Sequence, residues 1–204
     1  MLVILGGFKV TDKIDLIHNL LNIADELIIG GGMSNPFIRQ FQGLKLGKTQ
    51  IDMPENPNTL QGILDKARER GVKIHLPVDG VCAKEYSPTS PTSIYDNDKI
   101  PDDLEIFDKG PKSVKLFDEV IQRASSIFWN GPIGVFEFPN FKNGSEGMLR
   151  SVIERTKKGG VSIIGGGDTA SLVNSRGAEK DVTYVSTGGG ATLEFMQGIK
   201  LPGV

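Results

Sequence analysis

The sequence predicts an α/β protein with a doubly wound, mostly parallel sheet of about six strands and helices on both faces. Apolar runs that end in glycines recur at 2–7, 27–32, 161–168 and 183–190, and a fifth run, 127–132, ends in Gly-Pro. A short apolar run bounded by glycine and followed by an amphipathic segment is typical of a buried parallel strand that enters a helix. The length of 204 residues, 38% of them hydrophobic, suits a single domain, 1–204, with a full-sized core.

Strands and helices are expected to alternate along the chain. In order, we expect strand 2–7, helix 11–23, strand 27–31, helix 33–42, helix 58–70, strand 73–78, a hairpin-like or irregular stretch 80–109, helix 111–124, strand 126–130, a turn region 131–143, helix 144–157, strand 161–165, helix 168–176, strand 182–186 and helix 190–197. This alternation implies right-handed crossovers and a Rossmann-like sheet.

Local signals support individual elements. Thr11 and Asp12 suit the start of the first helix, whose apolar positions recur at helical spacing: Ile14, Ile17, Leu20 and Leu21. Gly71 follows the helix 58–70, where a C′ glycine ends a helix. The stretch 84–109 contains three prolines in a polar, charged composition, so we expect it to be the least regular part, a surface excursion near the site.

Composition excludes several classes of protein. With 23 Lys and Arg against 25 Asp and Glu, the net charge is −2, which gives no support for a nucleic-acid partner. No apolar stretch approaches the roughly 20 residues of a membrane span. The single cysteine, Cys82, excludes an intrachain disulfide framework and fits a reducing compartment. We expect a cytoplasmic monomer without a signal peptide. Because the chain opens inside a strand and ends abruptly at 201–204, we also expect a piece of a longer protein.

The glycine-ended strands predict the kind of site. Glycines let the backbone turn sharply and leave N–H groups uncovered at helix N-termini, where partial positive charge collects. Several such ends at the carboxyl edge of one sheet would form a surface that receives phosphate. The pattern therefore indicates a nucleotide or phosphoryl-transfer site.

Two lysines, Lys9 and Lys13, follow the first of these glycine turns. Four residues apart at a strand-to-helix junction, they would point toward an anion at the strand ends. Lysine is a compact charge that can follow a migrating phosphoryl group. The alternative is a pair of solvated lysines, one of them paired with Asp12 or Asp15.

Asp168 and Thr169 follow a triple glycine, 165–167. The glycines place N–H groups at a helix N-terminus, and the acid stands where Mg²⁺ bound to phosphate would sit. The alternative is that Asp168 is an ordinary N-cap. The run 186–194 contains a second triple glycine, whose N–H groups would serve a transferring group. A turn for close packing is the alternative there.

Three other features are interpreted as structural or absent. The segment 43–49 resembles a P-loop, but it has three residues between its glycines where the motif needs four, and no strand precedes it. No strand is followed by G-x-G-x-x-G, the dinucleotide fingerprint. His18 and His75 lack a Ser, Cys or second His at triad or metal spacing, so structural roles are favoured.

Taken together, these motifs resemble the phosphoglycerate kinase family. The resemblance covers essentially the whole chain and follows the C-terminal, nucleotide-binding half of the family in order. The motifs that carry it are 5–14, 28–33, 76–79, 110–111, 128–137, 163–169 and 186–191. The family transfers a phosphoryl group between 1,3-bisphosphoglycerate and ADP, giving 3-phosphoglycerate and Mg-ATP in glycolysis.

The resemblance implies a role for each matching residue. Lys9 and Lys13 would contact the nucleotide phosphates and the group in flight, and Asp168 would hold Mg²⁺ with Thr169 at the phosphates. The N–H groups that meet the developing charge would belong to Gly166, Gly167, Gly189 and Gly190. The nucleotide pocket would consist of Gly7, Phe8, Gly31, Gly32, Tyr86, Ile106, Phe107, Asn130, Pro132, Val135, Phe136 and Glu137, the last of which would take the ribose hydroxyls. Phosphoryl transfer needs positioning and charge stabilisation, and the motifs accordingly contain no nucleophile.

Two positions depart from the family. Phe8 stands where the family usually has alanine, and Ile106 stands where the family has a glycine of the adenine-pocket loop. Both changes add bulk around the base. Either the loop repacks, or the affinity or selectivity for the base is altered.

The resemblance covers one half of a two-domain kinase. In the family, 3-phosphoglycerate binds basic residues of an N-terminal domain that these 204 residues do not contain. We therefore expect this chain to bind adenine nucleotide with little or no turnover on its own. The alternatives are a stand-alone nucleotide-binding module or pseudokinase and, less favoured, an unrelated dinucleotide-binding oxidoreductase domain.

Overall fold

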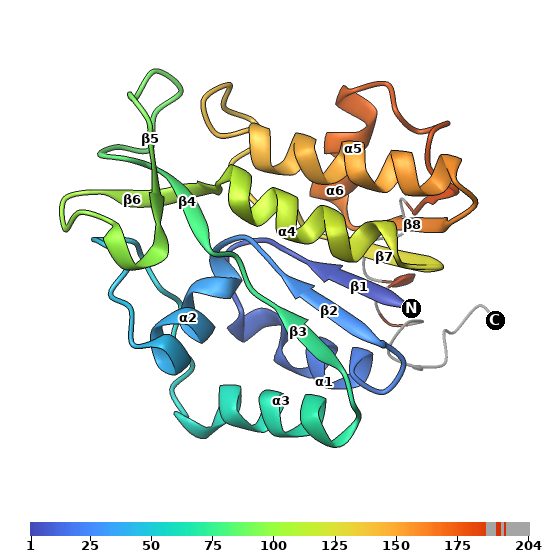
Figure 1. Cartoon of the computed structure of the whole chain (residues 1–204), viewed down its shortest axis with the longest axis horizontal. Helices are drawn as coiled ribbons and strands as arrows, with labels where there is room; N and C mark the ends of the chain where they lie inside the picture. Colours follow the sequence, from blue (N-terminus) through green and yellow to red (C-terminus); the bar gives the residue numbers. More distant parts are fainter. Residues whose placement is uncertain (187–190, 193, 195–204) are drawn as a thin grey trace.

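The computed structural model describes residues 1–186, 191, 192 and 194, and a six-stranded sheet lies at its centre (Figure 1). The strand order is β3-β2-β1-β7-β8-β9, and all neighbours in it pair in parallel. The strands are β1 (Leu2–Leu5), β2 (Glu26–Ile29), β3 (Lys73–His75), β7 (Ser126–Asn130), β8 (Val161–Gly165) and β9 (Tyr184–Val185).

Helices cover both faces of this sheet (Figure 1). One face carries α1 (Ile14–Leu20), α2 (Asn35–Gln42) and α3 (Asn58–Glu69), and the other carries α4 (Pro111–Gln122), α5 (Asn143–Lys157) and α6 (Gly167–Ser175). Alternate residues of β1 serve the two cores: Val3 and Leu5 pack with α1 and α3, while Leu2 and Ile4 pack with α4 and α5. A strand buried on both faces reads as a continuous apolar run. The predicted doubly wound α/β fold is therefore confirmed.

The carboxyl ends of the central strands lie side by side. Leu5 pairs with Ile29 on one side and with Asn130 on the other, and Asn130 pairs with Gly165. The register thus gathers at one edge the glycines that follow these strands: Gly6, Gly30, Gly131 and Gly166. This is the edge at which open α/β sheets bind ligands.

A second, antiparallel sheet stands beside this edge (Figure 1). Its order is β5-β4-β6, built from β4 (Asp79–Ala83), β5 (Ser93–Asp96) and β6 (Glu105–Lys109). The expected hairpin is present in the pairing of β4 with β5, and β6 pairs on the other side of β4, so the irregularity expected over 84–109 is limited to the connections 84–92 and 97–104. The three prolines that suggested irregularity lie between the strands: Pro88, Pro91 and Pro101.

The two local helix signals have different outcomes. The first helix begins as a 3-10 turn, Thr11–Lys13, before α1. Thr11 does not cap it; its N–H and hydroxyl donate to Asp52 Oδ2 at 3.0 and 2.7 Å. Gly71, with φ +67°, ends α3 as predicted, since this left-handed conformation favours glycine.

Two strands predicted to run into glycines end before them: those expected over 2–7 and 27–31 end at Leu5 and Ile29, because the glycines leave the ladder at once. Two others are shorter without a glycine at the point where they stop or start. The strand expected over 73–78 stops at His75, and the one expected over 182–186 is confined to Tyr184–Val185. The helix expected over 190–197 falls mostly outside the described residues. Within the described part of the chain, no helix is long and apolar enough to cross a membrane.

Candidate functional site

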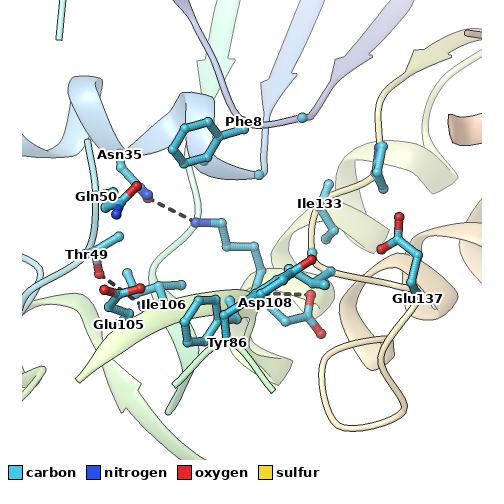
Figure 2. Close-up of a pocket in the computed structure, with 18 of the residues that line it drawn as sticks. Phe8, Asn35, Thr49, Gln50, Tyr86, Glu105, Ile106, Asp108, Ile133 and Glu137 are labelled. Carbon is cyan, nitrogen blue, oxygen red and sulfur yellow. Dashed lines mark hydrogen bonds between the residues drawn. The ribbon is translucent and has the colours of Figure 1, made fainter. Parts of the chain in front are cut away.

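A cavity of about 540 Å³ lies at the carboxyl edge of the parallel sheet, facing the small sheet (Figure 2). The residues predicted for the nucleotide site that line it are Gly7, Phe8, Gly31, Gly32, Tyr86, Ile106, Phe107, Pro132, Val135, Glu137 and Asp168. Its wall also contains residues that the sequence did not single out: Asn35, Thr49, Gln50, Glu105, Asp108, Lys109, Ile133 and Gly134. The fold therefore brings most of the predicted pocket together.

Glycine turns meet backbone to backbone at this edge. Gly31 has φ +59°, and a Cβ there would lie 2.4 Å from the Gly7 carbonyl oxygen. Gly131 has φ +98°, and a Cβ there would lie 2.3 Å from the Gly6 carbonyl oxygen. Any side chain at these positions would push the strand ends apart. The glycines thus allow the turns after β1, β2 and β7 to pack into one wall.

Lys13 lies between two of these strand ends. Its Nζ donates to the Gly6 carbonyl oxygen at 2.9 Å and to Asn130 Oδ1 at 3.0 Å. Burial lowers the pKa of Lys13, and the Asp168 charge opposes that shift. An ammonium carries three N–H groups, so two are used in these bonds. The alternative of a solvated lysine paired with Asp12 does not hold for Lys13.

Lys9 is exposed and does not line the cavity. Its charge acts instead on Asp52, the residue that holds Thr11. Burial raises the pKa of Asp52, but the two Thr11 hydrogen bonds and the Lys9 charge outweigh it and lower the pKa. Lys9 and Lys13 therefore lie in different environments, although the sequence spacing suggested a common direction.

The start of α6 carries the predicted metal residue. Gly166, with φ +90°, is the N-cap, so the alternative of Asp168 as an ordinary N-cap is wrong. Gly167 and Asp168 are exposed, and Asp168 lines the cavity. Thr169 is fully buried, and its Oγ1 accepts a hydrogen bond from the Gly131 N–H at 2.6 Å. Thr169 therefore ties α6 to the turn after β7.

Other predicted residues lie behind the wall or beyond the described chain. Asn130 is buried and holds Lys13, and Phe136 belongs to the core on the α4 and α5 face. Gly189 and Gly190 fall outside the described residues.

Asp108 is a buried carboxylate in the wall. Its Oδ2 accepts from the Gly144 N–H at 2.7 Å and its Oδ1 from the Lys109 N–H at 2.8 Å. Burial raises the pKa of Asp108 to about 7 despite these bonds. A Cβ at Gly134 or Gly144 would come within 2.0 or 2.1 Å of Asp108 Oδ1, so both glycines make room for the carboxylate.

Lys109 follows Asp108 and is 3% exposed. Its Nζ donates to Asn35 Oδ1 at 3.2 Å, and burial lowers its pKa to about 8. Sequence reasoning missed this residue, although a lysine placed directly before the Gly110-Pro111 start of α4 was a usable signal. The sequence around Asn35 contains no comparable indication of a site residue.

The position of segment 43–49 argues against a phosphate-binding loop. Gly43, with φ +68°, ends α2, and no strand precedes the segment, as predicted. Thr49 nevertheless lines the cavity, and its Oγ1 accepts from the Ile106 N–H at 3.0 Å. The segment therefore forms a side wall that is attached to β6.

The described residues contain no cluster of three or more His, Cys, Asp or Glu side chains that would hold a metal by themselves. Asp168 is a single exposed carboxylate at a helix N-terminus. Mg²⁺ in phosphate sites is typically bound by one or two carboxylates together with substrate phosphates and water. The donor set therefore fits a metal that arrives with a nucleotide.

The fold and this cavity define a class: a doubly wound α/β protein with a cavity at the carboxyl edge of the sheet, among glycine turns, where such folds bind ligands. The family model described as "Phosphoglycerate kinase" matches residues 1–199. The chain belongs to the phosphoglycerate kinase family. The alternative of an unrelated dinucleotide-binding domain is therefore wrong.

Named relatives agree with this assignment. Phosphoglycerate kinase of Euplotes crassus is 48% identical over 204 residues, which cover 99% of this chain and 49% of the relative. Phosphoglycerate kinase of Plasmodium falciparum is 46% identical over 206 residues, covering 100% of this chain and 49% of the relative. The solved structure of phosphoglycerate kinase from Coxiella burnetii matches with a TM-score of 0.90 at 37% identity, covering 97% of this chain and 50% of that one. The chain thus spans about half the length of these relatives.

Proposed function

We propose that this chain is the nucleotide-binding half of a phosphoglycerate kinase and binds Mg-ADP and Mg-ATP in the cavity. In the complete protein the reaction would transfer a phosphoryl group between 1,3-bisphosphoglycerate and ADP, giving 3-phosphoglycerate and Mg-ATP. The observation that carries the proposal is the position of Lys13, a half-buried ammonium held at the ends of β1 and β7 by Gly6 and Asn130. Such a charge, placed where ligands bind in this fold and with one N–H group left over, favours an anionic ligand.

The start of α6 supports the phosphate end of the site. The N-terminus of a helix carries about half a positive charge, and its free N–H groups bind phosphate oxygens. Gly166 and Gly167 supply those N–H groups, and Asp168 supplies a carboxylate for Mg²⁺. Bound Mg²⁺ would neutralise charge on the phosphate oxygens during transfer.

Phosphoryl transfer itself requires little covalent chemistry from the protein. In the proposed site, the Lys13 ammonium and the α6 N–H groups stabilise negative charge on the transferring group. Lys9, exposed in the loop before Lys13, keeps the phosphate-contacting role that the family resemblance implies. Gly189 and Gly190 keep the role that the family resemblance implies.

The nucleoside end would lie along the small sheet. Phe107 and Val135 line this wall, and the Val135 N–H donates to the Phe107 carbonyl at 3.0 Å. Glu137 would take the ribose hydroxyls. Phe8 lies on the wall of the cavity opposite the small sheet. Its ring packs against Gly32, since a Cβ at Gly32 would lie 2.8 Å from Phe8 Cδ2. The Phe8 ring therefore covers part of the glycine turn that would otherwise meet the base.

Binding is the direct test. Isothermal titration of the 204-residue chain with ADP should give saturable binding that strengthens when Mg²⁺ is present. In Asp168→Asn, the Mg²⁺-dependent gain should disappear while metal-free ADP still binds. NAD should not bind. Absence of ADP binding to the folded wild-type chain would refute the proposal.

Turnover separates the enzyme half from a stand-alone module or pseudokinase. Phe8 and Ile106 both add bulk to the cavity wall, and this observation keeps the module alternative open. The chain alone should form little or no ATP from 1,3-bisphosphoglycerate. A chimera that joins it to the half of the Coxiella burnetii relative outside the match should form ATP. A folded chimera that binds Mg-ADP without turnover would favour the module.

A further inference from the structure

Lys109 places a buried cation in the cavity wall that phosphate binding does not use. Lysine is almost never buried to this degree unless it is paired. Its Nζ donates to Asn35 Oδ1 at 3.2 Å, marked by the dashed line at Asn35 in Figure 2. No ion pair between Lys109 and a carboxylate occurs among the described residues. Lys109 therefore retains donor capacity beside the cavity.

The pair of Lys109 and Asn35 presents donors. An ammonium has three N–H groups and cannot accept a hydrogen bond. The Asn35 oxygen must therefore face Lys109, which leaves the amide NH₂ as the free end of Asn35. Asn35 is itself buried and lines the cavity. A ligand edge that reaches this pair must carry an acceptor.

An acceptor lies on the same side of the cavity. Glu105, at the start of β6, lines the cavity and is half-buried. Among the described residues, no hydrogen bond or ion pair engages its carboxylate. In Figure 2, Asn35 and Glu105 lie on one side of the cavity and Glu137 lies on the other. The side away from the predicted ribose residue thus carries both a cationic donor and a free carboxylate.

We propose that Lys109 and Glu105 make this cavity select 6-oxopurine nucleotides, those of guanine and hypoxanthine, over adenine nucleotides. The inference rests on the proposed nucleotide-binding function. The 6-oxo oxygen would accept from Lys109, and the adjacent ring N1–H would donate to Glu105. Adenine has an amino donor in place of the oxo oxygen and a bare acceptor at N1. It would therefore set donor against donor and acceptor against acceptor, leaving buried polar groups unpaired.

Aromatic contacts bind the ring without discriminating between purines. Phe8 is 52% exposed and Tyr86 is 63% exposed, and they approach the cavity from opposite sides (Figure 2). Stacking on aromatic faces tolerates every base, because every base has a π-face. Selection between purines is therefore assigned to the edge contacts, and Lys109 and Glu105 are the specificity-determining residues.

The test compares GDP, IDP and ADP, each with Mg²⁺, by isothermal titration into the full 204-residue chain. GDP and IDP should bind at least about tenfold more tightly than ADP, which is the discrimination that one matched contact to a base edge provides. Lys109→Met should reduce this ratio to about one, and Glu105→Gln should weaken GDP and IDP while changing ADP little. Lys45→Met is the matched control, since Lys45 is exposed, pairs with Asp102 and does not line the cavity.

The possible outcomes distinguish a failure of the selectivity from a failure of the proposed nucleotide binding. Equal or tighter binding of ADP to the wild-type chain overturns the selectivity and leaves nucleotide binding standing. That comparison needs no variant, so it decides the matter even where Lys109→Met fails to fold. Failure of all three nucleotides to bind refutes the proposed function and this inference together. If the ratio of GDP affinity to ADP affinity is unchanged in folded Lys109→Met, Lys109 is not the cause of the selectivity.

Discussion

The Lys13 ammonium donates to the Asn130 side-chain oxygen at 3.0 Å across 117 positions of sequence. This bond joins the loop after β1 to the end of β7. The Thr169 hydroxyl, which accepts from the Gly131 N–H, adds the start of α6 to the same edge. Three segments that would bind phosphate are therefore held relative to one another before any ligand arrives, which lowers the reorganisation required on binding.

Lys13→Met should weaken Mg-ADP binding about 10- to 100-fold, because a charge-assisted hydrogen bond contributes about 1.5–3 kcal/mol. Methionine keeps most of the buried stem, so circular dichroism should show a folded chain. Titration calorimetry gives the affinity, and Lys45→Met serves as the exposed-lysine control. An affinity within about twofold of wild type would contradict this role for Lys13.

Asp79→Ala should lower the free energy of unfolding by about 2–3 kcal/mol, because buried donors lose their acceptor. The Asp79 carboxylate accepts from the N–H groups of Lys112 and Ser113 at 3.0 and 2.8 Å, at the start of α4. It also accepts from the Ser113 hydroxyl at 2.5 Å. Urea denaturation measures the change. Asp65→Ala, on the exposed face of α3, should change stability by less than about 0.5 kcal/mol, and equal effects would count against the cap.

Stability at acid pH should depend on Glu26. Arg123 and His75 bond to Glu26, and the Arg123 hydrogen bond is the main cause that holds its pKa at about 2. The unfolded carboxylate has the ordinary value of 4.5, so it binds a proton first as the pH falls. The contribution is therefore complete above pH 4.5 and is lost as the pH falls toward 2.

Glu26→Gln should therefore lower the free energy of unfolding by about 1–2 kcal/mol near pH 7. Its stability should also change less than that of wild type between pH 4.5 and 2. Denaturation at a series of pH values gives both profiles. Glu154→Gln removes an exposed partner of Lys158 and should follow the wild-type profile. Parallel profiles for wild type and Glu26→Gln would show that Glu26 is not the responsible group.

Cys82 should be nearly inert in the folded protein. It is 1% exposed in β4, and burial raises its pKa to about 11. Because the thiolate is the reactive form, its reaction with a disulfide reagent at pH 8 should be about 100-fold or more slower than that of a free thiol. The same chain in guanidinium chloride should react at the rate of a free thiol. Equal rates in the native and denatured chains would place Cys82 at the surface.

The parallel sheet was predictable because its signal is local. A strand buried on both faces needs an apolar run, and a tight turn into a helix needs glycine, so both features appear in neighbouring residues. The small sheet was not recognised, because Pro88, Pro91 and Pro101 lie in its connections and masked the strands between them. Gly71 was predictable for the same local reason as the sheet.

Most of the cavity wall was predicted through matching motifs, and most of the residues missed lie outside those motifs. Asn35 and Lys109 meet across 74 positions, and nothing near either residue in the sequence indicates the other. Their contact depends on how the small sheet packs beside α2.

The sequence by itself determined the fold class, the glycine edge and the family, since each depends on residue types in a fixed local order. The tertiary structure alone decided which polar groups are paired: Lys13 with Asn130, Thr169 with Gly131, and Lys109 with Asn35. Hydrogen bonds act over about 3 Å, and only folding brings residues so distant in sequence within that range.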